Sequence, residues 1–133
     1  MTPKAHPMSD LSHLPPPSLT TEAVDLAVLP ELTGCDDAVR DEFLRDFLPV
    51  LRSEVQAMAD ALSPPDCAAV EAVAHRLKSA ARYVGAIGLG DLSERVELVS
   101  QGGDVVACQA LHGPWLAECQ RVEHFLRGLP GVG

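Results

Sequence analysis

The chain has 133 residues, a formal net charge of −9 and a hydrophobic content of 47%. It is long enough for one domain with a modest core, and its apolar content is typical of a globular protein rather than a disordered one. The acidic balance argues against a nucleic-acid partner. No apolar run approaches the roughly 20 residues of a membrane span, and the N-terminus lacks a secretory signal. We therefore expect a cytoplasmic protein with no membrane partner.

The first 20 residues are rich in proline. They contain five prolines, three of them consecutive at 15–17, and this composition predicts an extended or disordered tail. Residues 21–129 show no useful strand-like alternation, and their apolar residues recur at helical spacing. They predict one all-α domain, an antiparallel four-helix bundle with an additional short N-terminal helix, followed by a C-terminal tail at 130–133.

The first half of this domain predicts two helices. A short one covers 21–32 and ends at Gly34. A long one follows, capped by Asp36 or Asp37, and Pro49 inside it predicts a kink. The apolar positions of the long helix recur at steps of three and four and are expected to face the core: Val39, Phe43, Phe47, Leu51, Val55, Met58 and Leu62.

The sequence SPPD at 63–66 predicts the end of the long helix and the start of a third. Pro64 or Pro65 is expected in the first turn of that third helix, where a missing N–H is tolerated. Gly85 is its expected C-cap. The apolar stripe of the third helix is Cys67, Val70, Ala74, Leu77, Ala81 and Val84.

Two further helices complete the predicted bundle. The fourth carries Leu89, Leu92, Val96 and Val99 on one face and stops at the sequence QGGD. Asp104 is the expected cap of the fifth, and Gly113-Pro114 is expected to bend or break it. The fifth stripe is Cys108, Leu111, Trp115, Cys119, Val122, Leu126 and Leu129. Short loops at 63–66, 85–87 and 101–103 favour antiparallel neighbours.

The cysteines give no sign of a metal or redox motif. There are four, and no two form a CxxC pair. We expect all of them to pack as reduced thiols: Cys35, Cys67, Cys108 and Cys119.

His75 is predicted to lie outside the apolar stripe of the third helix. At about 100° per residue it falls roughly 140° from Val70, which lies within the stripe. Its face carries small side chains at Ala68, Ala72 and Ser79. Lys78 and Arg82 flank the same strip, inside a segment at 72–86 that contains no acid. The prediction is an accessible imidazole beside two cations.

Such an arrangement suits a phosphoryl acceptor. Neutral imidazole attacks a phosphoryl group, so the ring must be accessible. The phosphorylated ring carries about two negative charges, which nearby cations stabilise. Small neighbours let a second protein bring its phosphorylated side chain within bonding distance.

The segment HRLKSAARYVGAIGLGDLSERVE, which starts at His75, resembles the histidine-containing phosphotransfer (HPt) domain family. The family pattern is H-x-L-K-G-S-[SA]-x-x-x-G-A-x-x-L-x-x-L-x-x-x-[LV]-E, and the resemblance covers roughly residues 21–128. Matching positions are His75, Leu77, Lys78, Ala81, Gly85, Ala86, Leu89, Leu92, Val96 and Glu97. Ser79 replaces the usual glycine but is small, so access should survive. Ala80 replaces the usual serine, with loss of a minor contact.

The resemblance implies a carrier of phosphoryl groups in two-component phosphorelays. His75 would be the phosphoacceptor, Lys78 would balance phosphoryl charge, and Ser79 would permit close approach. Arg82 is added from the helical wheel alone. The predicted partner-binding surface is Ala68, Glu71, Ala72, His75, Lys78, Ser79 and Arg82.

The implied partners are receiver domains. They would include those of response regulators and of a hybrid histidine kinase. The chain should bind no cofactor of its own, because Mg²⁺ would be held by the receiver. It contains neither a P-loop nor a glycine-rich kinase box and is not expected to be an enzyme. We expect a monomer.

Three alternatives remain at this point. A histidine-kinase dimerisation domain has an acid directly after its histidine and a proline shortly after, where this chain has Arg76 and Ala80. A helical interaction module could bind receivers without transferring phosphate. A metal protein could use His112, His124 and the cysteines, but these do not pair at i, i+4 on a shared face.

Overall fold

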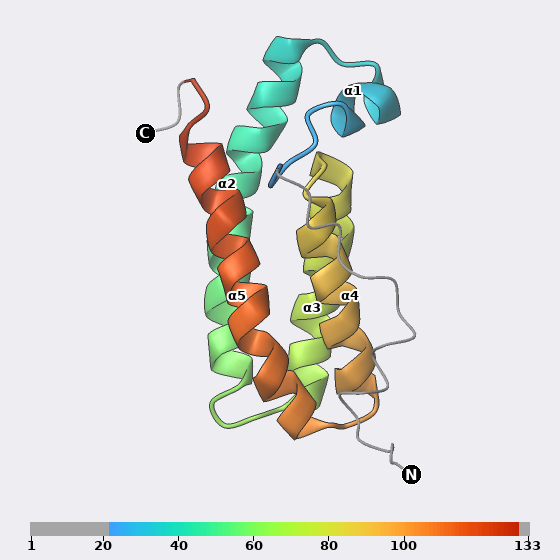
Figure 1. Ribbon diagram of the computed structural model, residues 1–133, viewed down its shortest axis with the longest axis vertical. Helices are drawn as coiled ribbons and strands as arrows, with labels where there is room; N and C mark the ends of the chain where they lie inside the picture. The colour runs from blue at the N-terminus through green and yellow to red at the C-terminus, as the bar shows by residue number, and fades with distance from the viewer. Residues whose placement is uncertain (1–21, 131–133) are drawn as a thin grey trace.

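The computed structural model describes residues 22–130, which form five helices and no strand. The tail predicted at 1–20, residue 21 and the end of the chain at 131–133 lie outside the described residues. The helices are α1 (Val28–Thr33), α2 (Asp37–Ala61), α3 (Cys67–Val84), α4 (Ile87–Gln101) and α5 (Val105–Arg127). Figure 1 shows α2 to α5 side by side as an antiparallel bundle, with α1 at one end. The predicted fold class is confirmed.

Aspartate caps begin three of the four long helices. Asp36, Asp66 and Asp104 each accept a hydrogen bond from the backbone N–H three residues later. This satisfies a donor that the first turn leaves without a helical partner. The predicted caps of α2 and α5 are thereby confirmed.

The start of α3 differs from the prediction. Asp66 is its N-cap, so Pro64 and Pro65 precede the helix and do not occupy its first turn. The Asp66 N–H donates to the carbonyl of Ala61 at 2.8 Å. The two prolines therefore lie in a turn that this bond closes, and α3 begins only after it.

The N-terminal helix is shorter than predicted. It begins at Val28, whereas residues 22–27 are not helical. Asp25 instead bonds to the turn between α3 and α4, where its N–H donates to the Gly85 carbonyl at 2.8 Å. Gly85 has φ +92°, and a Cβ there would collide with the Asp25 carbonyl. Glycine is therefore required at this C-cap for two reasons.

The core confirms the predicted stripes of α3, α4 and α5, apart from partly buried Cys67 and Leu129. Trp115 is fully buried in this core, and its indole N–H donates to the Ser93 hydroxyl at 3.0 Å.

The prediction that all four cysteines pack in the core as reduced thiols holds in part. Cys108 and Cys119 are buried, whereas Cys35 and Cys67 are half-buried, and all four are free thiols.

The stripe predicted for α2 is partly wrong. Val39 and Phe43 are exposed, and the buried set is Leu44, Phe47, Leu48, Leu51, Met58 and Ala61. Both sets follow helical spacing and share Phe47, Leu51 and Met58, so periodicity alone does not separate them. Packing of α2 against α3 and α5 selects the second set.

Neither internal proline ends its helix. α2 continues through Pro49, and α5 continues through Gly113-Pro114. Of the predicted bend or break at Gly113-Pro114, a break is thereby excluded, whereas the bend there and the kink at Pro49 stay predictions. Both prolines are exposed. The hydrogen bond that each proline removes is therefore lost on the solvent side, where water can satisfy the freed carbonyl.

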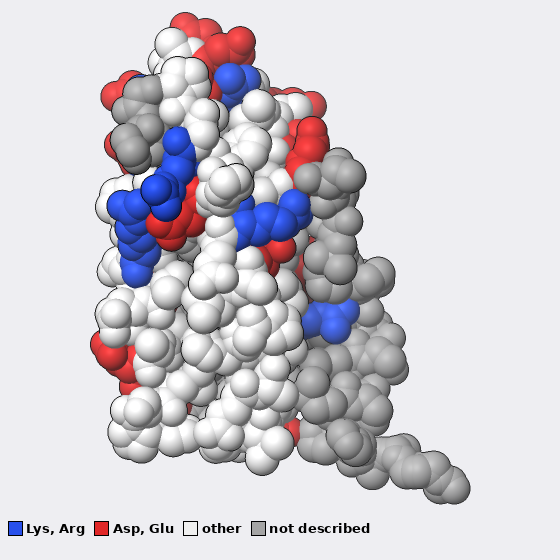
Figure 2. All heavy atoms as spheres, turned by 60° about the vertical axis from the view of Figure 1, so that its left-hand side comes forward, with Lys and Arg blue, Asp and Glu red and all other residues white. Residues whose placement is uncertain are grey.

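Charged side chains are mixed on the face that Figure 2 shows. Lys and Arg lie beside Asp and Glu there, next to a wide area without charged side chains. Ion pairs also join separate helices, as between Arg52 of α2 and Glu123 of α5 at 3.1 Å. This face does not present the broad basic surface of a nucleic-acid binder. Within residues 22–130, no helix combines the length and apolar character needed to cross a bilayer.

Candidate functional site

His75 lies on the outer side of α3, next to α4. Its side chain is 64% exposed, which confirms the predicted position outside the apolar stripe. Val73, Ala74 and Leu77 on the same helix are buried. The helix is therefore anchored on its inner side and presents the imidazole to solvent.

The ring is held by a carboxylate from the neighbouring helix. His75 Nδ1 lies 2.7 Å from Oε2 of Glu97 on α4, and the Glu97 side chain is only 9% exposed. An ionised carboxylate can only accept a hydrogen bond. In the neutral ring the proton is therefore assigned to Nδ1, and Nε2 keeps a free lone pair. Glu97 orients the ring and selects the nitrogen available for bond formation.

Lys78 completes this group from the next turn of α3. Its Nζ donates to Oε1 of Glu97 at 2.7 Å. Burial acts to raise the pKa of Glu97, but hydrogen bonds from Lys78 and His75, together with their charges, outweigh it and lower the pKa below its usual value. Glu97 is therefore ionised at neutral pH although it is buried.

Arg82 is engaged elsewhere. Its guanidinium donates to Asp91 at 3.0 Å and to Glu94 at 2.5 Å, both on α4. The side chain lies across Gly90, where a Cβ would come within 2.5 Å of the Arg82 Cγ. Two cations of the acid-free segment, Lys78 and Arg82, are thus paired with acids of α4. Lys78 and Arg82 are half-buried and paired, not free on an exposed strip.

The small residues predicted beside His75 are exposed. Ala68, Ala72 and Ser79 all lie at the surface of α3. Glu71 is half-buried, and its carboxylate accepts a hydrogen bond from Gln101 at 3.0 Å. Small side chains therefore lie three residues before and four residues after the imidazole on its own helix.

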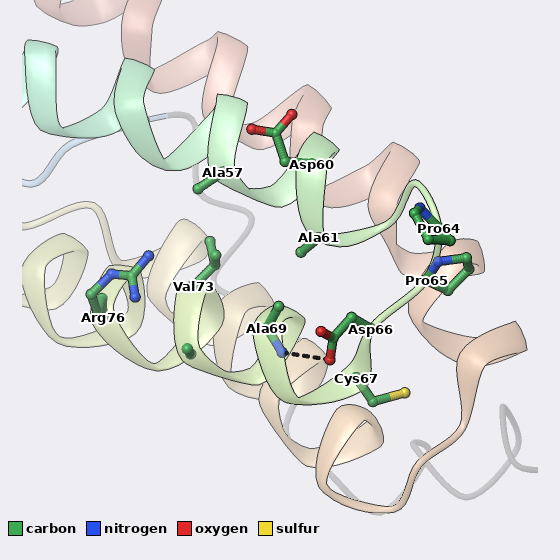
Figure 3. Close-up of a pocket in the computed structure, with 11 residues that line it drawn as sticks. Ala57, Asp60, Ala61, Pro64, Pro65, Asp66, Cys67, Ala69, Val73 and Arg76 are labelled. Carbon is green, nitrogen blue, oxygen red and sulfur yellow. Dashed lines mark hydrogen bonds between the residues drawn. The ribbon is translucent and has the colours of Figure 1, made fainter.

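A groove separates α3 from α2 on the other side of the histidine. It has a volume of about 870 Å³, and its walls are mostly small side chains, among them Ala57, Ala61, Ala69 and Ala72. Figure 3 shows Ala57, Ala61 and Ala69 between the two helices, with the Pro64-Pro65 turn at one end. Toward the other end of the groove, the Arg76 guanidinium donates two hydrogen bonds to the Glu54 carboxylate, at 2.9 and 2.8 Å.

Glu97 is the residue whose role the sequence reasoning missed. It matched the family pattern but was given no function. In the sequence, Glu97 is an acidic residue directly beside the apolar stripe of the fourth helix. A carboxylate that is buried there needs a hydrogen-bonding or charged partner, and this requirement was the signal for its role. The Arg76–Glu54 pair was also missed, because it joins two helices whose register the sequence does not give.

The described residues contain no metal-ligating cluster. Within 22–130, no group of three or more His, Cys, Asp or Glu side chains could hold a metal ion. The ring of His112 instead stacks beside Trp115, with 6.3 Å between the ring centroids.

Comparison with known proteins identifies a family. A family model described as "Hpt domain" matches residues 42–127, which is more than half of the chain and includes His75, Lys78 and Glu97. No curated protein and no solved structure matches significantly.

Proposed function

The chain belongs to the Hpt domain family, and from this premise we propose that it passes phosphoryl groups between receiver-domain aspartates through a phosphohistidine on His75. Members of the family are helical phosphocarriers of two-component signalling rather than catalytic enzymes. The observation that supports the proposal best is the exposed His75 ring, whose Nδ1 is bound to buried Glu97 and whose Nε2 is free.

The proposed step is a displacement at phosphorus. The Nε2 lone pair of His75 forms a bond to the phosphorus of an aspartyl phosphate, and the bond from phosphorus to the aspartate oxygen breaks. The aspartate leaves as a carboxylate. The ring keeps its Nδ1 proton and becomes positively charged, and the Glu97 carboxylate balances this charge. The reverse step returns the phosphoryl group to a second receiver.

Lys78 supports this step through Glu97. With its ammonium 2.7 Å from the Glu97 carboxylate, it keeps that group ionised and in place. It also offsets part of the negative charge that arrives with the phosphoryl group. Arg82, already bound to Asp91 and Glu94, is proposed to contribute less.

Receiver domains are the proposed partners, from a response regulator and from a hybrid histidine kinase. The exposed small residues Ala68, Ala72 and Ser79 would let the receiver approach the ring closely. Mg²⁺ is proposed to belong to the receiver, where it would polarise the aspartyl phosphate. A monomeric state and a cytoplasmic location stay predictions.

The test is incubation with purified phosphorylated receiver domains. We expect acid-labile, base-stable label on this chain within minutes, and no label from ATP alone. His75→Gln should accept none while it keeps the helical signal and melting temperature of the wild type, because the side chain is exposed. Label that persists in His75→Gln would overturn the assignment. Binding without any label on the wild type would identify an interaction module instead.

A further inference from the structure

Two aromatic side chains meet at the surface between α2 and α3. The rings of Phe43 on α2 and Tyr83 on α3 pack edge to face, with 6.3 Å between their centroids and 74° between their planes. Phe43 is 40% exposed and Tyr83 is 43% exposed. Contact across the two helices therefore holds the pair in place, while a large part of each residue stays open to solvent.

Tyr83 continues a line of residues that begins at His75. His75, Ser79 and Tyr83 follow at steps of four, which places them on one ridge of α3, and all three are exposed. The ridge starts beside α4, where His75 bonds to Glu97, and ends beside α2, where Tyr83 contacts Phe43. At 1.5 Å per residue, the eight residues from His75 to Tyr83 span about 12 Å along the helix.

The α4 side of His75 offers a partner less free surface than the sequence predicted. Lys78 and Arg82 are half-buried there and form ion pairs with acids of α4. Glu71 is half-buried as well and accepts a hydrogen bond from Gln101. On the α2 side, the aromatic pair lies toward one end of α3 and the groove of Figure 3 lies toward the other. A protein that extends from His75 toward α2 therefore meets small and apolar side chains.

We propose that Phe43 and Tyr83 form an anchor of the receiver-docking surface and help to set which receiver the chain accepts. This rests on the proposed function, because a receiver whose aspartyl phosphate reaches His75 must cover the residues around it. A specific interface buries about 800 Å² on each partner, which corresponds to a disc of roughly 16 Å radius. Tyr83, about 12 Å from His75 along α3, lies inside such a footprint.

The chemistry of the pair defines what the receiver brings to it. Aromatic rings gain most from apolar side chains that lose water together with them, and the phenol hydroxyl of Tyr83 adds one hydrogen-bonding group. Aromatic residues carry much of the affinity at many interfaces. Because the contact between the two rings orders them before association, less conformational freedom is lost on binding. We therefore expect the matching receiver to present an apolar surface about 12 Å from its aspartyl phosphate.

The experiment measures receiver binding and phosphoryl transfer separately. A panel of purified receiver domains is titrated against the full chain by calorimetry, and the tightest binder is used throughout. Tyr83→Ser and Phe43→Ser should each raise its Kd about tenfold, whereas Tyr83→Phe, which keeps the ring, should stay within about threefold of wild type. Transfer at saturating receiver should stay within about twofold, because the His75–Glu97 contact is unchanged. Labelling by phosphoramidate, a small donor that needs no docking surface, should be equal in all variants.

Val106→Ser is the matched control. Val106 is 73% exposed but lies in the first turn of α5, so its loss should leave Kd unchanged. Circular dichroism and analytical ultracentrifugation check that each variant keeps the fold and the oligomeric state of the wild type. In the double variant Tyr83→Ser/Phe43→Ser, the loss of affinity should be smaller than the sum of the single losses, because the two rings act as a unit.

The outcomes distinguish this inference from the proposed function. An unchanged Kd in both serine variants would overturn the anchor, as would an equal loss in Val106→Ser or a change in self-association with receiver affinity intact. If the wild type binds the receiver through the pair but accepts no phosphoryl group, the anchor stands and the proposed function fails. A wild type that binds no receiver would overturn both.

Discussion

Glu97 of α4 accepts a hydrogen bond from the ring of His75 on α3, with 2.7 Å between Oε2 and Nδ1. The donor is exposed and the acceptor is buried. The nitrogen that points into solvent is thereby Nε2, and the charge that compensates the ring is fixed in position before a partner arrives. In the proposed reaction this charge requires little reorganisation, which is a general source of rate in electrostatic catalysis.

Two substitutions of Glu97 should distinguish its role in orienting the His75 ring from the role of its negative charge. Glu97→Gln keeps an oxygen that can accept from Nδ1 but removes the charge, and we expect phosphoryl transfer to slow about tenfold. Glu97→Ala removes both and leaves Lys78 without its partner, so the loss should be larger. Single-turnover transfer from a labelled receiver measures both rates, and circular dichroism serves as the control for folding. Equal rates in wild type and Glu97→Ala would show that the carboxylate has no role.

Stability should depend on pH through the same carboxyl. The folded state lowers the pKa of Glu97, so its ionised form contributes stability above the unfolded pKa of about 4.3, and this is lost as pH falls through the folded pKa. The difference in unfolding free energy between wild type and Glu97→Gln should therefore shrink from pH 7 to pH 3.5. Urea unfolding at several pH values measures it. A difference that grows toward acid pH would contradict a lowered pKa for Glu97 in the folded state.

Lys78 and Arg82 should differ in their effects on transfer. Lys78→Ala frees Glu97 from its ammonium, so we expect transfer to slow by several-fold to about tenfold and the phosphohistidine to hydrolyse faster. Arg82→Ala leaves the His75–Glu97–Lys78 contacts intact, and its transfer rate should stay within about twofold of wild type. Rate, phosphohistidine half-life and receiver affinity are measured for both. If only affinity falls, the cations serve docking and not the phosphoryl group.

Position 79 should accept only small side chains without loss of phosphoryl transfer. It is exposed four residues after His75, so a side chain there lies beside the imidazole on the same face. Ser79→Gly and Ser79→Ala should transfer near the wild-type rate. Ser79→Trp should lose most transfer but melt near the wild-type temperature, since the exposed position leaves the core unchanged. Normal transfer by Ser79→Trp would place the docking surface elsewhere.

Gly90 should be coupled energetically to Arg82. In most helix interiors Gly→Ala stabilises by up to ~1 kcal/mol. Here a new Cβ would lie 2.5 Å from the Arg82 Cγ and displace the side chain from Asp91 and Glu94, so no gain is expected. In an Arg82→Ala background the same change should stabilise by ~0.5–1 kcal/mol. Denaturant unfolding of the four proteins measures the coupling, and additive effects would show that Arg82 does not lie across Gly90 in solution.

Periodicity predicted the parts of the fold that depend on one helix at a time. The stripes of α3, α4 and α5 and the exposure of His75 follow from spacing along a single chain segment. The buried face of α2 did not, because two overlapping stripes both satisfy the helical period and only the neighbouring helices select one. The proline turn before α3 was misplaced because Asp66, rather than a proline, begins that helix.

At the site, too, only the features that lie on a single helix were predictable from the sequence. His75 and its small neighbours lie on one helix, and their common face could be calculated. The partners of Lys78 and Arg82 lie on α4. Their positions depend on how two helices align, which the spacing within either helix does not specify. For this reason the sequence did not reveal that Lys78 and Arg82, in a segment without acids, are paired with acids of the neighbouring helix.

Trp115 gives this chain a built-in optical reporter. It is the sole tryptophan, it is fully buried, and its N–H binds Ser93, one turn before Glu97 on α4. Indole emission shifts to longer wavelength when water reaches the ring, so unfolding can be followed without a label. Because the ring is bonded to the helix that holds Glu97, a change in α4 on phosphorylation of His75 would alter the same emission. One fluorescence trace can therefore follow both the stability of the bundle and events at its surface histidine.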